Sequence, residues 1–306
     1  MQYVKLEDLV NYMDLESVYY PEDEQSRIYT PEIIRPGLQL AGYFDRFSFE
    51  RVQVMGKTEM FYMKTLDENT KKQRLDKFFR FPIPALILAN EVAIDKDLIY
   101  YAKKYKRPVF TSNQKTDKLV NVLINFLEEE LAEETTIHGV CLEVFGVGVL
   151  IRGKSGIGKS ETSLELINRG HRLVADDAVI IKKVENGLKA TCPELTQHLM
   201  EIRGLGILDI THLFGVGSIR LEQFVEIVIE LEEWDENKEY DRIGTDEDYT
   251  EILGVKIPTV LIPVRPGRNI SAIIELAAKN YRQKLLGYDS LETYSRRFHK
   301  LARSRY

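Results

Sequence analysis

Hydrophobic positions in the first 132 residues form short apolar runs separated by longer stretches with helical spacing. Residues 84–89 and 108–110 are short apolar runs, which predict buried strands. Residues 95–106 and 118–131 repeat apolar side chains three and four positions apart, which predicts helices with one buried face. This alternation of strand and helix predicts a largely parallel sheet. The earlier stretch 43–63 is aromatic and alternating, which predicts additional strands.

The second part of the chain contains further strands and helices. Apolar or alternating stretches predict strands at residues 139–144, 147–151, 173–175 and 225–231, a hairpin at 182–189, and helices at 160–168, 270–286 and 290–303. An acidic run at 128–134 ends the last helix of the first part, so we place a domain boundary near Ala132. The predicted fold class is α/β, with an N-terminal α/β domain over residues 1–132 and a second domain over 133–306.

Length and composition narrow the protein class. A chain of 306 residues favours two domains over one compact core. Hydrophobic residues make up 44% and charged residues 29%, as in ordinary globular proteins. The net charge is −6 and no basic domain stands out, so a nucleic-acid partner is not expected. No apolar stretch reaches the roughly 18 residues of a membrane span, and the acidic N-terminus does not fit a signal peptide.

Cysteine and histidine usage argues against a disulfide framework or a metal site built on these residues. The two cysteines, Cys141 and Cys192, are far apart and form no CxxC pair. We therefore interpret both as small buried hydrophobes in a reducing cytoplasm. The five histidines form no HExxH motif or close pair.

A glycine-rich segment after the predicted strand 147–151 carries the clearest chemistry. It matches the phosphate-binding pattern GxxxxGK[ST] without departure: Gly153-Lys154-Ser155-Gly156-Ile157-Gly158-Lys159-Ser160. Its glycines allow backbone N–H groups to converge on phosphate oxygens, and the helix that follows adds its positive dipole end. Lys159 is expected to reach the β- and γ-phosphates, and the Ser160 hydroxyl to ligate Mg²⁺. A glycine-rich turn without a ligand is the weaker alternative.

Two acids follow the predicted strand 173–175. Asp176 and Asp177 are expected at the carboxyl edge of the sheet, near the phosphate loop. Adjacent strand residues face opposite sides, so we expect different roles: one acid orients Mg²⁺ and the other takes a proton from a hydroxyl. A solvated acidic turn is the alternative. Motors, GTPases and kinases all remain open at this point, although the HRDxxxxN and DFG motifs of common protein kinases are missing.

Five further segments, taken in order with the phosphate loop between the first two, closely resemble bacterial HPr kinase/phosphorylases. They are Ile137-His138-Gly139-Val140, Val174-Ala175-Asp176-Asp177, His198-Leu199-Met200-Glu201-Ile202-Arg203-Gly204-Leu205-Gly206-Ile207, Tyr240-Asp241-Arg242-Ile243-Gly244, and Ile262-Pro263-Val264-Arg265-Pro266-Gly267-Arg268-Asn269. The resemblance covers the whole second domain. It extends more loosely over the first domain, where residues 35–43 are family-like.

The resemblance implies a bifunctional enzyme whose second domain is a P-loop nucleotide-binding kinase domain. Such an enzyme uses ATP to phosphorylate a regulatory serine on HPr, the carrier protein of the sugar phosphotransferase system. It also removes that phosphate by phosphorolysis, with inorganic phosphate as acceptor and pyrophosphate as product. The family is typically hexameric, responds to fructose 1,6-bisphosphate and phosphate, and serves carbon catabolite repression.

The same resemblance assigns the central site residues. Asp177 is the base that deprotonates the serine, with Asp176 as the second choice. Glu201 assists Mg²⁺ alongside Ser160, within the signature segment Glu201, Ile202, Arg203, Gly204, Leu205 and Gly206. The stretch between Asp177 and Glu201 is about one residue shorter than the usual family length, which leaves Glu201 and Ile202 as alternatives for the magnesium ligand. We choose Glu201 over Ile202 as the magnesium ligand because isoleucine has no oxygen to offer.

Three further assignments come from the resemblance and have plainer alternatives. His138 lies by the phosphates, whereas without the family a satisfied core histidine is the better interpretation. Arg242 stabilises charge on the transferring phosphoryl group, whereas the polar run 232–242 by itself indicates a solvated loop. The turn Pro263-Val264-Arg265-Pro266-Gly267-Arg268 serves dephosphorylation, whereas by itself it indicates an ordinary surface turn.

Two alternative functions and one further segment complete the predictions. A P-loop small-molecule kinase is the principal rival. A nucleotide sensor without enzymatic activity is the second rival, although it has no need of a base such as Asp177. The basic segment 296–305 is predicted to help hold HPr or a neighbouring subunit, and a solvated helix face is its plainer interpretation.

Overall fold

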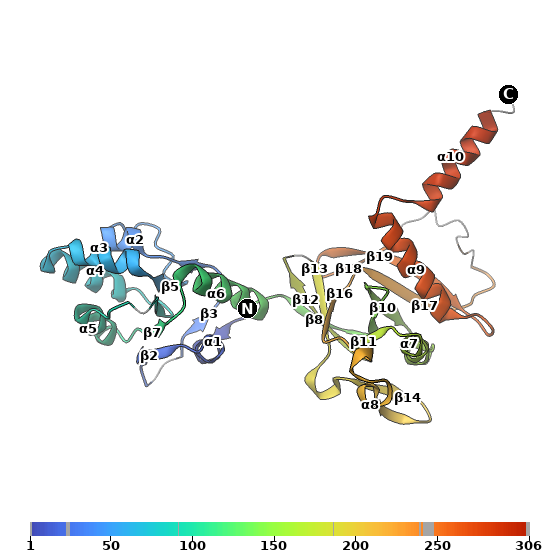
Figure 1. Ribbon diagram of the computed structural model, residues 1–306, viewed down its shortest axis with the longest axis horizontal. Helices are drawn as coiled ribbons and strands as arrows, with labels where there is room; N and C mark the ends of the chain where they lie inside the picture. The colour runs from blue at the N-terminus through green and yellow to red at the C-terminus, as the bar shows by residue number, and fades with distance from the viewer. Residues whose placement is uncertain are drawn as a thin grey trace. The chain divides into compact units, whose positions relative to one another are not determined.

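The computed structural model describes residues 2–22, 25–90, 92–185, 187–238, 240 and 248–303. The chain divides into two compact units, Met1–Ala132 and Glu133–Tyr306 (Figure 1). Each unit has its own sheets and its own hydrophobic clusters. Across the described part of the chain, no helix combines the length and the hydrophobicity that a membrane crossing requires.

The N-terminal unit is built on a five-stranded sheet in the order β2-β7-β6-β5-β4, with β4 to β7 parallel and β2 antiparallel at one edge. A short ribbon pairs β1 with β3. The elements are β1 Val4–Lys5, α1 Leu6–Met13, β2 Glu16–Tyr19, β3 Arg27–Ile28, β4 Ile33–Ile34, α2 Gly37–Ala41, β5 Val52–Met55, α3 Lys57–Thr65, α4 Glu68–Arg80, β6 Leu86–Ala89, α5 Lys96–Lys104, β7 Val109–Ser112 and α6 Thr116–Glu130.

Helices cover both faces of this sheet. One hydrophobic cluster joins α1 and α6 to strand residues such as Val54 and Ile87. A second cluster joins α2, α3, α4 and α5 to residues of the opposite face, such as Met55 and Leu88. Neighbouring strand residues therefore enter different cores, which explains why these strands are hydrophobic at successive positions. The sequence prediction of a largely parallel sheet is confirmed.

The prediction of additional strands in 43–63 is confirmed only for one short strand. Residues Val52–Met55 form β5, but α3 begins at Lys57. The Glu59 carboxylate accepts a hydrogen bond of 2.9 Å from the Gly56 amide and caps this helix. The capping bond turns the aromatic, alternating stretch into a helix that packs Met60 and Met63 into the core.

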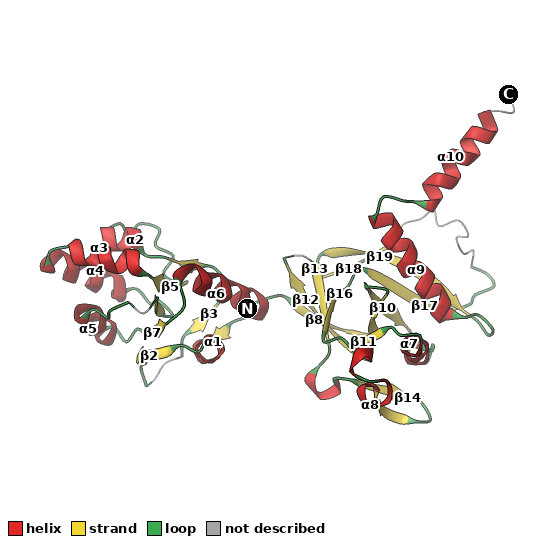
Figure 2. Cartoon of the chain, in the orientation of Figure 1, coloured by secondary structure: helices red, strands yellow, loops and turns green. Residues whose placement is uncertain are grey.

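The C-terminal unit has three layers (Figure 2). Its elements are β8 Glu134–His138, β9 Val140–Val144, β10 Val147–Gly153, α7 Lys159–Asn168, β11 Arg172–Ala175, β12 Ala178–Val184, β13 Gly187–Thr191, η1 Glu194–Thr196, β14 Leu199–Ile202, β15 Gly206–Asp209, α8 Ile210–Phe214, η2 Val216–Ser218, β16 Glu222–Phe224, β17 Ile227–Glu233, β18 Asp248–Ile252, β19 Val255–Val264, α9 Ile270–Leu285 and α10 Ser290–Arg303.

The middle layer is a six-stranded sheet in the order β11-β9-β10-β17-β19-β18. One face packs against α7 and α9, and the other packs against a four-stranded sheet, β16-β13-β12-β8. Cys141 lies fully buried in the second of these cores, where burial raises the pKa of its thiol to about 12, so it behaves as the predicted small hydrophobe. Cys192 is only half-buried.

Strand direction sets the position of the functional site. Strands β10, β17 and β19 are parallel, and β11 runs the same way because both β11 and β10 are antiparallel to β9. The carboxyl ends of β10 and β11 therefore lie at one edge of the sheet, two strand positions apart. Open α/β sheets place their ligands at this edge.

Candidate functional site

The segment Gly153–Ser160 connects the end of β10 to the start of α7. Gly153, Gly156 and Gly158 have φ values of +143°, +83° and +99°, a region that side chains other than glycine rarely adopt. A Cβ atom at Gly153 would approach the Leu231 carbonyl oxygen to 2.5 Å. The backbone conformation therefore requires glycine at these positions. The loop joins a strand to a helix, as the sequence predicts.

Lys159 is buried within this loop, with 7% of its surface exposed. Its ammonium group donates hydrogen bonds of 2.9 Å to the Gly153 carbonyl and 3.1 Å to the Lys154 carbonyl. The charge is thus held against the loop, in the position where a phosphate group would contact both the ammonium and the backbone N–H groups.

Asp176 is the buried acid of the pair, with 4% of its surface exposed. One carboxylate oxygen accepts a 3.0 Å bond from the Ser160 hydroxyl, and the other accepts a 3.2 Å bond from the Glu201 amide. Burial raises the pKa of Asp176 above its ordinary value, while these two hydrogen bonds work in the opposite direction. The carboxylate is therefore fixed against Ser160, the residue that the sequence motif predicts as a Mg²⁺ ligand.

Asp177 has a different environment. Its backbone has a φ of +66°, an uncommon conformation that often marks functional sites. The side chain is 72% exposed and lies 2.9 Å from Nδ1 of His138, at the end of β8. The two acids thus differ in environment as expected, but the cause is this left-handed turn beyond β11, and not alternation within a strand.

The β14–β15 hairpin supplies the next side of the site. Glu201 is exposed and lines the cavity, whereas its neighbour Ile202 is buried in the hydrophobic core. This arrangement supports the choice of Glu201 over Ile202. The Arg203 guanidinium donates a 3.2 Å bond to the Ser155 hydroxyl of the phosphate loop. Gly204 and Gly206 adopt positive φ values at the turn beside the exposed Leu205.

These elements enclose a cavity of about 140 Å³. The residues that line it are His138, Val140, Ser155, Gly156, Gly158, Lys159, Ser160, Glu161, Asp176, Asp177, Glu201 and Arg203. The cavity combines cations for binding phosphate with an exposed carboxylate that can exchange a proton. No cluster of three or more histidine, cysteine or acidic side chains suited to a metal occurs among the residues that the structure describes.

Comparisons with known proteins agree along the whole chain. The family domain described as "HPr Serine kinase C-terminal domain" matches residues 129–298, and "HPr Serine kinase N terminus" matches residues 4–127. The HPr kinase/phosphorylase of Alkaliphilus metalliredigens is 47% identical over 301 residues, which cover 98% of this chain and 97% of that protein. The chain belongs to the HPr kinase/phosphorylase family.

Other members of the HPr kinase/phosphorylase family show comparable similarity. The protein from Peptoclostridium acidaminophilum is 48% identical over 298 residues, covering 97% of both chains. A solved structure of the HPr(Ser) kinase/phosphatase from Coxiella burnetii is 38% identical and covers 52% of this chain and 98% of its own, with a TM-score of 0.47.

The remaining two elements that the family resemblance predicts are Arg242 and the turn Pro263–Arg268. Arg242 falls in residues 241–247, which are not among the described residues. The turn Pro263–Arg268 lines a separate groove of about 1510 Å³ with Trp234 and Tyr240. There the Arg265 guanidinium lies 4.9 Å from the Trp234 ring centre, and Arg268 donates to the Pro263 carbonyl at 2.9 Å.

Sequence reasoning assigned no individual role to two charged residues of the cavity. Glu161 follows the GK[ST] motif directly, so the motif itself could have indicated it. Arg203 belongs to the predicted signature segment, but its contact with Ser155 joins residues 48 positions apart. No local pattern signals such a contact.

Proposed function

We propose that this chain phosphorylates a regulatory serine of HPr with ATP and removes the same phosphate by phosphorolysis. The proposal depends on the different environments of two adjacent acids. Asp176 is buried against Ser160, and Asp177 is exposed beside His138. Such a pair provides one carboxylate for a metal and one for proton transfer. Family membership supplies the substrate.

In the forward direction, Lys159 and the loop N–H groups hold the phosphates of ATP. Asp177 accepts the proton of the serine hydroxyl, whose oxygen forms a bond to the γ-phosphorus as the bond to ADP breaks. His138 orients Asp177 through the Nδ1 contact. Arg203, held on Ser155, adds positive charge beside the phosphates.

In the reverse direction, inorganic phosphate attacks the phosphorus of the phosphoserine and forms pyrophosphate. Asp177, now protonated, returns its proton to the departing serine oxygen, as microscopic reversibility requires. The groups that neutralise the phosphates of ATP serve equally for free phosphate and pyrophosphate. One cavity therefore supports both reactions.

Ser160, Asp176 and Glu201 fit a Mg²⁺ ion. They are oxygen donors at one end of the cavity, and Mg²⁺ in nucleotide sites takes few protein ligands because phosphates and water complete its coordination. We assign Ser160 and Glu201 as ligands and Asp176 as the group that orients Ser160. Bound Mg²⁺ would neutralise charge on the phosphate oxygens.

Two loops complete the proposed site. The polar loop with Arg242 and the turn Pro263–Arg268 follow β17 and β19, whose carboxyl ends lie at the same edge as the phosphate loop. Arg242 stabilises the transferring phosphoryl group, and Arg265 and Arg268 bind phosphate in the reverse reaction. Closure of both loops over the cavity excludes water, which would otherwise hydrolyse ATP.

The proposed setting follows from the family resemblance. The chain forms a homohexamer in the cytoplasm, responds to fructose 1,6-bisphosphate and phosphate, controls carbon catabolite repression, and has no nucleic-acid or membrane partner. The basic segment 296–305, of which α10 carries residues up to Arg303, helps hold HPr or a neighbouring subunit.

One experiment separates this function from its rivals. The purified protein is incubated with ATP, Mg²⁺ and HPr, and then with inorganic phosphate. Serine-phosphorylated HPr followed by pyrophosphate release supports the proposal. Phosphorylation of a metabolite alone supports a small-molecule kinase, and the absence of turnover supports a nucleotide sensor. The Lys159→Met variant serves as the control, because it removes the phosphate-binding ammonium group.

A further inference from the structure

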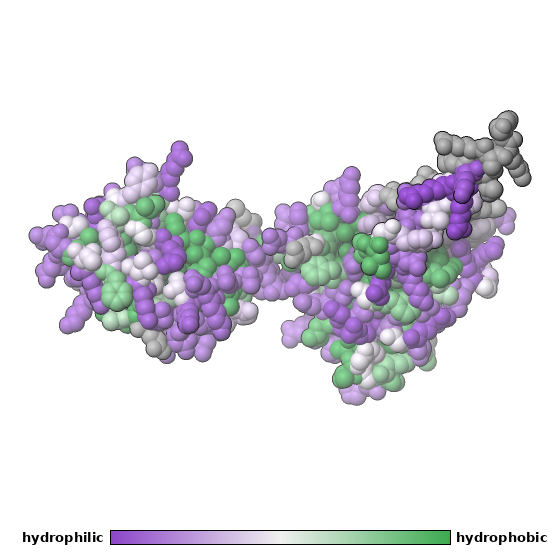
Figure 3. Space-filling model, turned by 45° about the horizontal axis from the view of Figure 1, so that its top comes forward, coloured by the Kyte–Doolittle hydropathy of each residue, from purple (hydrophilic) through white to green (hydrophobic). Residues whose placement is uncertain are grey.

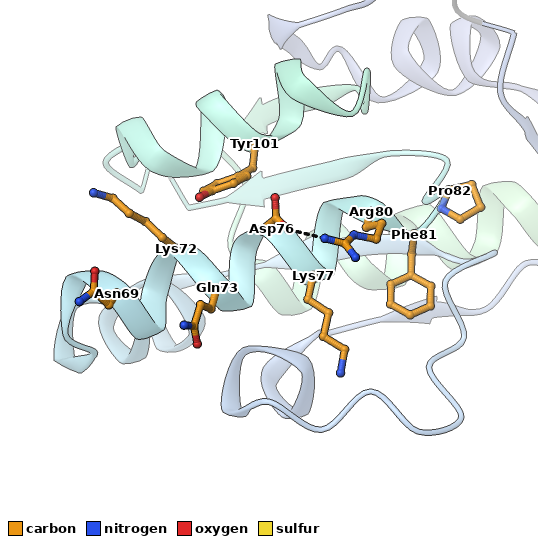
Figure 4. Close-up of a pocket in the computed structure, with 9 residues that line it drawn as sticks. All are labelled: Asn69, Lys72, Gln73, Asp76, Lys77, Arg80, Phe81, Pro82 and Tyr101. Atoms are coloured by element: carbon orange, nitrogen blue, oxygen red, sulfur yellow. Dashed lines mark hydrogen bonds and ion pairs between the residues drawn. The ribbon is translucent and has the colours of Figure 1, made fainter.

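The N-terminal unit has a pocket of its own, of about 740 Å³ (Figure 4). It lies over α4, between α5 and the segment that follows α4. The residues that line it are Asn69, Lys72, Gln73, Asp76, Lys77, Arg80, Phe81, Pro82 and Tyr101. None of them belongs to the phosphate-loop cavity, and the volume is typical of small-molecule sites.

Positive charge dominates this pocket. The lining includes three cations, Lys72, Lys77 and Arg80, and one carboxylate, Asp76. Residues 67–107 carry ten basic and six acidic side chains, a net charge of +4, although the whole chain has a net charge of −6. The excess of positive charge is therefore local to the stretch of sequence that carries α4 and α5, and it favours an anionic ligand.

The single carboxylate of the pocket already has partners. Asp76 accepts hydrogen bonds of 2.7 Å from Arg80, 2.6 Å from Lys104 and 2.9 Å from the Tyr105 hydroxyl. The bond from Lys104 is the main reason why the pKa of Asp76 lies below its ordinary value, so the group is ionised at neutral pH. One negative charge thus fixes two cations in place, and a net positive charge remains.

At the other end of the pocket, Phe81 belongs to a cluster of aromatic rings. The Phe81 ring stacks on Phe44 at 5.9 Å and meets Phe47 edge-on at 5.1 Å. The Lys77 ammonium group lies 4.6 Å from the centre of the Phe44 ring. Figure 4 shows the Lys77 and Phe81 side chains pointing to the same side of α4. A cation and an apolar surface are therefore presented together.

We propose that this pocket binds a phosphate ester. Lys77, Arg80 and the amide of Gln73 offer several N–H donors to phosphate oxygens, and Phe81 with Pro82 packs against the organic part of the molecule. A nucleotide and a sugar phosphate share this chemistry. The site is independent of the reaction proposed for the C-terminal unit.

Hydrogen exchange on the full-length protein tests the proposal with three separate probes: ADP, fructose 1,6-bisphosphate and inorganic phosphate. ADP and phosphate also reach the phosphate loop, so the readout is the protection of residues 68–82 and 96–105 alone. We expect at least one of the two esters to protect these segments. The concentration for half-maximal protection should rise at least tenfold in the Lys77→Gln/Arg80→Gln double variant.

Matched variants keep this test decisive. Lys118→Gln removes an exposed charge from α6, on the opposite face of the sheet, and should leave the protection unchanged. Thermal unfolding confirms that each variant is folded. The proposal is overturned if no probe protects these segments, if phosphate alone protects them, or if the double variant binds as the wild type does.

Discussion

The hydroxyl of Ser160 and the carboxylate of Asp176 are joined by a hydrogen bond of 3.0 Å, although the two residues belong to different elements. Ser160 lies in the first turn of α7, and Asp176 follows the end of β11. This bond ties the acid to the metal side of the proposed site. Its neighbour Asp177 is exposed in the same cavity and contacts His138, so it is available to the substrate.

Substitution of each acid by its amide should therefore give different defects. Asp176→Asn should weaken Mg²⁺ affinity by about 10–100-fold, as loss of an orienting group does. Asp177→Asn should leave Mg²⁺ affinity unchanged and lower kcat in both directions by about 10²–10⁴-fold, the usual contribution of a general base. Calorimetric titration with Mg²⁺ and ATP, combined with rates on HPr, distinguishes the two. The opposite pattern would exchange the roles of the two acids.

The pH dependence of stability should also change on substitution of Asp176. Its pKa is raised from the ordinary 3.8, chiefly by burial, so the folded state binds this proton more tightly than the unfolded state. The stabilisation is fully present below pH 3.8 and is lost as the pH rises through the folded pKa. Asp176→Asn cannot ionise and should gain stability relative to the wild type across that window. Denaturation of the metal-free proteins from pH 3 to 8 measures this, and a constant difference would contradict it.

Two glycines of the phosphate loop should differ in their tolerance of alanine. At Gly158 the new Cβ has open space, so the cost is the strain of a positive φ, about 1–2 kcal/mol. At Gly153 the new Cβ would also lie 2.5 Å from the Leu231 carbonyl oxygen of β17, which must move. Gly153→Ala should therefore lower the melting temperature further than Gly158→Ala. Equal melting temperatures would argue against the close approach of β10 and β17.

The rim of the phosphate-loop cavity beside Glu201, which includes Ile207, should contact HPr. Ile207 pairs directly across the β14–β15 hairpin with Glu201 and is 70% exposed, and Leu205, Leu213 and Val216 are exposed nearby in sequence. Figure 3 shows hydrophobic residues gathered on the C-terminal unit. A protein that presents a serine to this small cavity has to rest on the rim of the cavity. Ile207→Ser should raise KM for HPr roughly tenfold, the effect of losing one well-packed contact.

The control for the rim is Leu286→Ser, an exposed leucine just beyond α9. It should leave KM for HPr unchanged, and both variants should retain their affinity for ATP. If Ile207→Ser alters the oligomeric state and not KM, the rim is a contact between subunits.

Local chemistry made part of the site predictable. The glycine spacing of 153–160 predicts the loop by itself, because the backbone has a positive φ at each of these three glycines. The Asp176–Asp177 pair was found in the same way, from its place after an apolar strand. The burial of Asp176 was not predictable, because Ser160 and the Glu201 amide lie 16 and 25 positions away.

The fold shows the same limit. Strands such as β6 and helices such as α6 were predicted because burial repeats along their length. Helix α3 was missed because its start depends on one capping contact, from Gly56 to Glu59, within an aromatic stretch that resembles a strand. The pocket over α4 was also missed, since it joins side chains of separate helices and a loop whose individual patterns indicate only solvated faces.

The direct bond between the Glu201 amide and Asp176 has a consequence for the evolution of chain length. It fixes both ends of the intervening segment, so a residue gained or lost there has to be absorbed between them, in the β12–β13 ribbon or in residues 192–198. The length of this segment can therefore change while Asp176 and the Glu201 amide stay joined. For protein engineering, an insertion within this segment is expected to leave the contact between Asp176 and the Glu201 amide in place.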